Sequence, residues 1–196
     1  MDSITGIYGI GNGPTGSKDP YALRRLALGL LRILVEGKQD LNLIELIDSS
    51  LNLHSKEVNR DMSNEIYKFM MERLKAYYKE SQVDGNVFEA VLAVSPESPL
   101  DFHLRIKALN EFIQHSESRS LIEANKRIAN ILKDYDGKEL KLNSSLLEEE
   151  AEKKLYLATQ AITKQLKKEK DYGSIMSSLL ALKEVINSNL QVQLQQ

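Results

Sequence analysis

Cysteine is absent from the 196-residue sequence. Its absence excludes disulfide bonds, thiolate catalysis and metal sites built from thiolates, and it is typical of a cytoplasmic protein. Long apolar runs are absent too: none approaches the roughly 20 residues that a membrane-spanning helix needs, and no signal peptide opens the chain. The sequence therefore predicts a cytoplasmic protein with no membrane partner.

An excess of charge of either sign is lacking as well. The formal net charge is -2, so the chain as a whole does not attract nucleic acid, and any RNA binding has to come from a local basic face. Hydrophobic residues make up 42% and charged residues 28% of the sequence, which is an ordinary globular composition. The length suits one domain or two small ones.

Strand signals are scarce, and only GIYGI, residues 6–10, carries one. After the glycine-rich opening, the pattern is helical throughout. Asp19 is the expected N-cap of the first helix, Pro20 its first residue and Gly37 its end. Further helices are predicted over about 41–51, 57–81, 86–94, 99–115, 118–133, 145–169 and 173–188. The predicted fold class is an all-α bundle with a glycine-rich N-terminal loop.

The apolar spacing also predicts which side chains face the core. In the first helix they are Leu23, Leu26, Ala27, Leu30, Leu31 and Leu34. In the helix over about 57–81 they are Ile66, Phe69, Met70, Leu74 and Tyr77. In the helix over about 99–115 they are Leu104, Ala108, Leu109 and Phe112. In the helix over about 118–133 they are Leu121, Ala124, Ile128, Ile131 and Leu132.

The glycine-rich opening, GIGNGPTGSKDP, contains the letters of a dinucleotide-binding fingerprint in Gly11, Gly13 and Gly16. That motif needs a preceding strand and a helix that begins inside it, and neither is predicted. The P-loop alternative fails because Ser17 separates the last glycine from Lys18. We therefore expect the glycines to shape a tight loop, with contact to RNA or to a partner subunit as the alternative. The start of the chain directly before this segment indicates a fragment of a longer protein.

No catalytic or metal-binding constellation is apparent. The three histidines, His54, His103 and His115, are far apart in the sequence and form no zinc-binding spacing. No nucleophile-elbow motif is present. The sequence predicts neither catalytic residues nor a metal site.

A basic, amide-rich stripe lies in EANKRIANILK, residues 123–133. Lys126, Asn130 and Lys133 recur at i, i+4 and i+7 opposite the apolar side, and Arg127 is adjacent. Cations beside amides suit an RNA backbone or a single-stranded loop. The alternative, favoured by composition alone, is that Arg127 pairs with Glu123 and the rest is solvated.

The preceding helix offers one more cation as a candidate for RNA contact. Arg105 lies on the helix predicted over about 99–115. Asp101, four residues earlier, is at the spacing of a helical ion pair. Pairing with Asp101 is therefore the alternative for Arg105.

Six stretches, in this order, resemble one family. They are GNGPTGSKDPYALRRLALGLLRILVE, FMMERLKAYYKE, FHLRIKALNEF, EANKRIANILK, LLEEEAEKKLY and DYGSIMSSLLALKEVI. Together they resemble the C-terminal third of the beta subunit of the bacterial tetrameric glycyl-tRNA synthetase, over residues 3–187. The long N-terminal part of that subunit is absent, and the family continues into further helices where this chain ends NSNLQVQLQQ.

The resemblance implies a linker loop and helical segment of the beta-subunit body over residues 1–55. Over residues 56–196 it implies a helical anticodon-binding domain, similar to that of arginyl-tRNA synthetase and incomplete at its C-terminus. The full enzyme joins glycine to its tRNA with ATP and magnesium, mainly on the alpha subunit, while this fragment holds no cofactor. The implied partners are glycine tRNA, the alpha subunit and the rest of the beta subunit, and not DNA.

The resemblance also carries residues over. Asn125, Lys126, Arg127 and Asn130 match the family as tRNA contacts, and the basic pattern adds Lys133 and Arg105. Lys18, Arg24 and Arg25 match the loop motif as possible contacts to RNA or to a subunit. The alternative function is a helical subunit-contact module without independent RNA binding.

Overall fold

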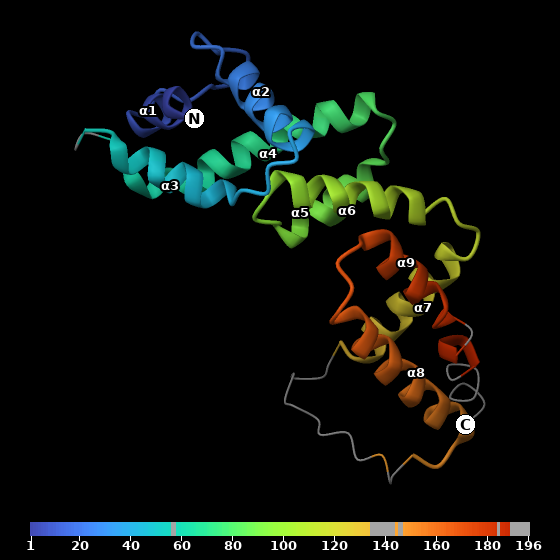
Figure 1. Ribbon diagram of the computed structural model, residues 1–196. Coiled ribbons are helices and arrows are strands. Elements are labelled where there is room, and N and C mark those ends of the chain that lie inside the picture. Colours follow the sequence, from blue (N-terminus) through green and yellow to red (C-terminus); the bar gives the residue numbers. More distant parts are fainter. Residues whose placement is uncertain (56–57, 134–143, 145–146, 184, 189–196) are drawn as a thin grey trace. The chain divides into compact units, whose positions relative to one another are not determined.

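The computed structural model describes residues 1–55, 58–133, 144, 147–183 and 185–188. These residues form α-helices and short 3₁₀ segments and contain no strand, which confirms the predicted all-α class (Figure 1). The chain divides into two compact units, residues 1–107 and 108–196. Residues on both sides of position 55 therefore belong to one unit. The predicted domain boundary between residues 55 and 56 stays a prediction.

Unit 1 is built around one long helix. Its elements are α1 (Asp2–Gly9), α2 (Leu23–Glu36), α3 (Leu43–Leu53), η1 (Arg60–Met62), α4 (Ser63–Glu80), α5 (Gly85–Val94) and the beginning of α6 (Pro99–Phe112). The α4 helix packs against α2, α3 and α5, and α1 packs against α2 and α3 (Figure 1).

The core of unit 1 follows the predicted periodicity in α2 and α4. Ile66, Met70 and Leu74 are fully buried at spacings of four residues, as predicted. Buried residues of α2 include Leu23 and Ala27, but Leu26 is 46% exposed, so the predicted stripe of α2 is wrong at that position. The helix is apolar on two sides, and α4 covers only one of them.

The register predicted for α6 is also partly wrong. Phe102 and Ile106 are buried together with Ala108 and Phe112, whereas Leu104 is 45% exposed. The Phe102 ring centre lies 5.3 Å from that of Phe88 on α5. This aromatic contact directs the 102 and 106 positions inward, and the periodicity of leucine and alanine in α6 gave no sign of it.

The GIYGI stretch is helical, so the strand signal there is misleading. Residues 2–9 form α1, whose glycines face neighbouring side chains. A Cβ atom on Gly9 would lie 2.1 Å from Val58 Cγ1, and one on Gly6 would lie 2.8 Å from the His54 ring. The glycines therefore allow α1 to approach its neighbours closely.

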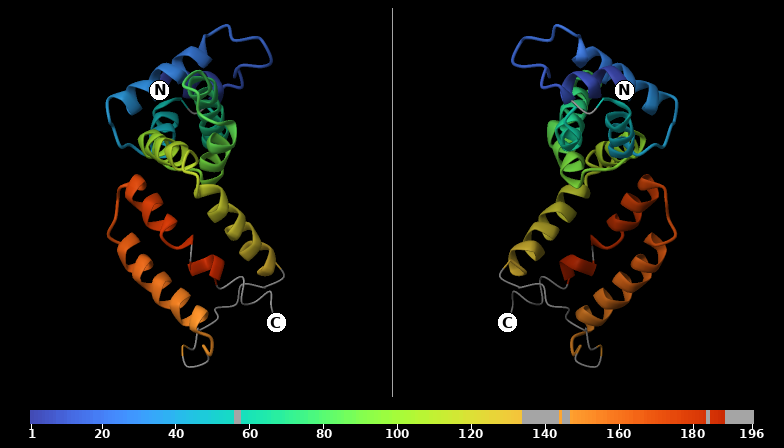
Figure 2. Two further views of the ribbon diagram at one scale, coloured as in Figure 1. Left: turned by 90° about the vertical axis from the view of Figure 1, so that its right-hand side faces the viewer. Right: turned by 90° about the vertical axis from the view of Figure 1, so that its left-hand side faces the viewer.

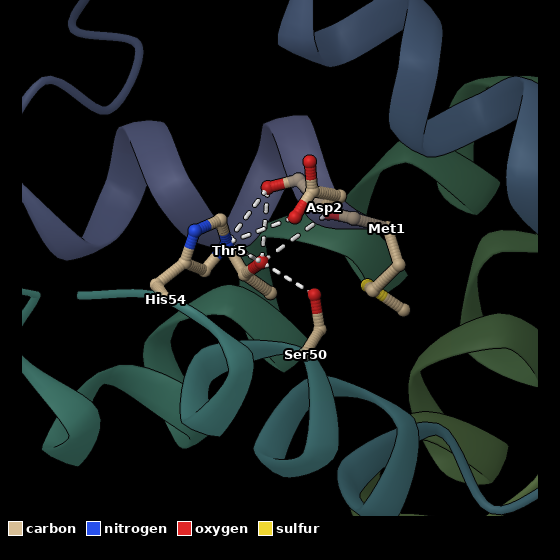
Figure 3. Close-up of polar contacts among 5 residues, drawn as sticks. All are labelled: Met1, Asp2, Thr5, Ser50 and His54. Carbon is tan, nitrogen blue, oxygen red and sulfur yellow. Dashed lines mark hydrogen bonds and ion pairs between the residues drawn. The ribbon is translucent and has the colours of Figure 1, made fainter.

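A polar cluster joins α1 to α3 (Figure 3). Thr5 Oγ1 donates to the Asp2 carbonyl oxygen at 3.0 Å and lies 2.7 Å from Ser50 Oγ. The Nε2 atom of His54 lies 3.0 Å from Thr5 Oγ1 and 3.3 Å from the Asp2 carboxylate. Thr5 is fully buried, and these contacts satisfy its hydroxyl group, as burial of a polar group requires.

The loop from residue 10 to residue 22 is held by its own polar groups. Thr15 and Lys18 pair through two backbone hydrogen bonds, and Gly16 between them has φ +51. The helix begins at Leu23 and its N-cap residue is Ala22, so the predicted start at Pro20 and the predicted N-cap position of Asp19 are wrong. Asp19 nevertheless caps it, because its carboxylate accepts from the backbone N–H groups of Leu23 at 2.8 Å and Arg24 at 3.0 Å.

Replacing Asp19 with alanine is expected to lower the free energy of unfolding by about 0.5–2 kcal/mol, because two N-terminal N–H groups of α2 lose their acceptor. Urea unfolding followed by circular dichroism measures this loss. Asp40→Ala, which removes an exposed aspartate outside the helices, is the matched control and should change stability by less than about 0.5 kcal/mol. Equal stability of the two variants would contradict the capping role.

Unit 2 contains the last residues of α6, then α7 (Ser118–Ile131), α8 (Glu150–Leu166) and α9 (Tyr172–Leu180). Both views in Figure 2 show α8 and α9 running side by side, and these two helices are in contact. On α7 only Ala124 and Ser118 are buried. Ile131 and Leu132 are 65% and 53% exposed, so the prediction that they face a core is wrong. They lie at the C-terminal end of α7, where no other described part of the chain covers them.

Candidate nucleic-acid interface

The outer face of α7 presents the predicted basic stripe to solvent. Asn125, Lys126, Arg127, Asn130 and Lys133 are all exposed. The buried Ala124 lies on the opposite side of the helix. Four of these side chains therefore lie on one helix, as the sequence predicted, and Lys133 lies in the turn two residues after its end.

None of the described residues neutralises the cations of this stripe. In the part of the chain that the structure describes, no ion pair includes Lys126, Arg127 or Lys133, and the expected pairing of Arg127 with Glu123 is not formed. An exposed, unpaired cation on a stiff helix is available to an anion such as a phosphate group.

Arg105 does not join this surface. It belongs to unit 1, where its Nε–H donates to the Asp101 carboxylate at 2.9 Å, so the alternative pairing is the one observed. The hollow around it also contains the carboxylates of Asp40 and Glu97. These acidic neighbours disfavour a phosphate at Arg105, whose role in RNA binding stays a prediction.

The three cations of the loop region have different surroundings. A terminal N–H of Arg24 donates to the Gly16 carbonyl oxygen at 2.6 Å, so this guanidinium holds the loop. Lys18 and Arg25 are exposed. The first N–H groups of α2 face the Asp19 carboxylate, and a phosphate cannot occupy the same place. The loop therefore offers two exposed cations but no phosphate cradle at the helix end.

Sequence reasoning missed one residue of the α7 face. Arg119 is exposed and lies seven residues before Lys126, close to two turns of helix. It precedes the basic stretch that the sequence analysis considered. A search for cations at intervals of seven residues would have found it.

The polar cluster in Figure 3 contains a histidine, two hydroxyl groups and a carboxylate, but its geometry is not that of a catalytic triad. Thr5 and the Asp2 carboxylate both approach the same ring nitrogen, Nε2 of His54. A nucleophile and an orienting carboxylate use the two different nitrogens of the ring. The cluster is therefore a structural contact between α1 and α3.

His103 is also part of the core packing. Its Nδ1 atom lies 2.9 Å from the Tyr78 hydroxyl group, and the two rings stack. Burial lowers the pKa of His103, and the nearby Lys107 lowers it further. Burial likewise raises the pKa of Tyr8 to about 12. These shifts arise from packing inside unit 1.

Among the described residues, no group of three or more histidine, aspartate or glutamate side chains is arranged to hold a metal ion. Among the helices that the structure describes, none is both long and apolar enough to cross a membrane.

The fold and this surface define an all-helical protein with an exposed basic helix. Residues 1–93 match the family model described as glycyl-tRNA synthetase beta subunit. The whole chain is similar to proteins named glycine–tRNA ligase beta subunit. It is 44% identical over 194 residues to that of Coxiella burnetii (strain Dugway 5J108-111), which covers 95% of this chain and 28% of the relative.

Other relatives carry the same name. Identity is 40% over 193 residues to the protein of Pseudomonas aeruginosa (strain LESB58), with 96% of this chain and 28% of the relative covered. It is 38% over 192 residues to that of Hahella chejuensis (strain KCTC 2396), with 95% and 28% covered. The chain is thus similar to glycine–tRNA ligase beta subunits over nearly its whole length, in agreement with the resemblance of its sequence motifs.

The chain spans 28% of the length of these curated relatives. The expected position in the C-terminal third of the subunit stays a prediction.

Proposed function

We propose that this chain is a tRNA-binding part of a glycine–tRNA ligase beta subunit. It holds the anticodon side of glycine tRNA in a helical anticodon-binding domain and supports the ATP-dependent attachment of glycine without catalysing it. The observation that carries the proposal is the exposed face of α7 and of the turn after it, where Lys126, Arg127 and Lys133 have no ion-pair partner among the described residues. The similarity of the chain to beta subunits supports the same function.

Charge and hydrogen bonding on α7 are of the kind that RNA requires. Within residues 118–133, four side chains are cationic and one, Glu123, is acidic. This excess is local, because the whole chain has a net charge of -2. The amides of Asn125 and Asn130 add donors and acceptors that can reach phosphates or ribose hydroxyl groups.

The other expected partners are inferred from the similarity of the chain to beta subunits. In the whole enzyme the alpha subunit and the rest of the beta subunit would be the protein partners, and ATP with magnesium would act at the aminoacylation centre. Translation of the genetic message places such an enzyme in the cytoplasm. None of these steps requires a catalytic residue in this chain.

A second candidate function, a subunit contact, is favoured by the outer face of α2. Leu26 is 46% and Ile33 is 66% exposed, although both lie in the middle of a well-formed helix. Gly29 lies between them with open space around it. Exposed aliphatic side chains seven residues apart form a row that a second protein could cover. Ile33→Asp is expected to reduce co-purification with the alpha subunit and to leave tRNA binding unchanged.

The primary test is a filter-binding titration of the chain with glycine tRNA. Lys126→Ala is expected to weaken binding by about 0.5–2 kcal/mol and to make the salt dependence shallower, because one phosphate contact is lost. Lys68→Ala removes an exposed lysine from α4 in unit 1 and is the matched control. Absence of binding by the unmodified chain, or equal affinity of the two variants, would reject the proposed site.

A further inference from the structure

Two exposed cations of α7, and a third in the turn directly after it, recur at regular intervals and form a row. Arg119, Lys126 and Lys133 follow one another at intervals of seven residues, and all three are exposed. Two helical turns contain about 7.2 residues, so Lys126 is rotated by only about 20° from Arg119 around the helix axis. With a rise of about 1.5 Å per residue, these two lie about 10 Å apart along α7, and Lys133 follows in the turn after Ile131.

Arg127 lies beside this row and not in it. It follows Lys126 directly, so it projects about 100° further around the helix. That direction brings it toward Ser120 and Ile131, at the border of the side that contains the buried Ala124. Asn130, in contrast, lies on the outer face between Lys126 and Lys133. The row therefore consists of three cations with one amide, and Arg127 is a lateral neighbour.

The types of side chain in and around the row indicate which kind of RNA it would bind. Proteins that bind unpaired nucleotides stack the bases on aromatic side chains. Residues 118–133 contain no phenylalanine, tyrosine, tryptophan or histidine. The row therefore offers positive charges at regular intervals, together with the amide group of Asn130. Such a surface suits the regular phosphates and ribose hydroxyl groups of a paired stem, which proteins recognise mainly by shape and backbone contacts.

We infer that Arg119, Lys126 and Lys133 bind the sugar–phosphate backbone of a double-helical RNA stem, without reading its base sequence. This inference rests on the proposed function, since it assumes that RNA binds α7. It differs from that proposal in the part of the RNA that it assigns to α7. The helix holds a double-helical stem, and α7 does not read the unpaired anticodon bases.

Fluorescence anisotropy with three RNA probes tests the inference on the full chain. The probes are glycine tRNA, a fully paired RNA hairpin, and a single-stranded RNA of equal length that cannot pair. We expect the hairpin to compete with tRNA at least tenfold better than the single strand. Exchange of the base pairs in the hairpin should leave its affinity unchanged within about twofold. Comparable competition by the two short RNAs would overturn the inference.

Single substitutions test the row itself. Arg119→Ala and Lys133→Ala are each expected to weaken hairpin binding as much as Lys126→Ala, and Arg127→Ala is expected to weaken it less. Each lost row contact should lower the salt slope by about 1, so that raising salt from 50 to 200 mM costs about 3.5-fold less in affinity than for the unmodified chain. Circular dichroism confirms that each variant is folded, and Lys68→Ala is the control for the change in net charge.

The outcomes separate this inference from the proposed function. If Lys126→Ala weakens tRNA binding while Arg119→Ala does not, the row is wrong and the proposed function stands. If the unmodified chain binds neither tRNA nor the hairpin, both are wrong. If Arg127→Ala weakens hairpin binding more than Arg119→Ala, the lateral position deduced for Arg127 is overturned and with it the row.

Discussion

Phe102→Ala is expected to lower the free energy of unfolding by about 3–5 kcal/mol, the largest effect among the substitutions considered for this protein. The Phe102 side chain is fully buried. Its ring centre lies 5.3 Å from that of Phe88 and 5.9 Å from that of Tyr78. Removal of the ring therefore leaves a cavity where α4, α5 and α6 meet, and the loss of aromatic contacts adds to the lost burial.

Leu104→Ala is the matched control for this substitution. Leu104 lies on the same helix but is 45% exposed, so its truncation should cost less than about 1 kcal/mol. Urea unfolding followed by far-ultraviolet circular dichroism gives both values. A larger loss for Leu104→Ala than for Phe102→Ala would mean that α6 packs in the register that its leucine spacing suggests, and that the observed core of unit 1 is wrong.

Gly9→Ala is expected to cost about 1–3 kcal/mol, because a methyl group there overlaps with a neighbour. The new Cβ atom would lie 2.1 Å from Cγ1 and 3.1 Å from Cβ of Val58. Valine has few rotamers with which to avoid the contact. The last turn of α1, or the segment that contains Val58, has to move apart. The midpoint of thermal unfolding measures the loss.

Gly29→Ala provides a control of opposite sign. Gly29 lies inside α2 with nothing within 4 Å of an added Cβ atom. Alanine there should stabilise the helix by about 0.5–1 kcal/mol, since glycine is unfavourable in a helix interior. Stabilisation by both substitutions would show that α1 does not approach Val58 as closely as described.

The apolar periodicity of the sequence was sufficient to predict the buried side of some helices and not of others. In α4, Ile66, Met70 and Leu74 are buried as predicted, whereas Phe69 and Tyr77 are only half-buried and the buried side extends to Tyr67, Met71 and Tyr78. In α6 and α2 apolar residues lie on more than one side. Their spacing is then compatible with several registers, and the choice depends on which neighbouring helix covers which side. That neighbour is not encoded locally, which explains the errors at Leu104 and Leu26.

The candidate RNA-binding surface, too, was predicted from the sequence only in part. The exposure of Lys126 and Asn130 follows from their position opposite the apolar side of one helix, and the sequence predicted it; Lys133 is exposed in the turn after that helix. The pairing of Arg105 with Asp101, and the absence of a pair between Arg127 and Glu123, did not follow. Both pairs have the same spacing of four residues, and local geometry permits each. Only the rotamers and surroundings in the folded chain distinguish them.

The amino-acid sequence alone was enough to establish the helical class, most helix positions and the family resemblance, because these depend on periodicity and on motifs within short segments. The tertiary structure decided which face of α2 and α6 is buried, that GIYGI is a tightly packed helix, and that Asp19 occupies the end of α2 where a phosphate would have to bind. The physical reason is that burial, close approach and the use of each hydrogen-bonding group depend on residues distant in the sequence, which only the fold brings together.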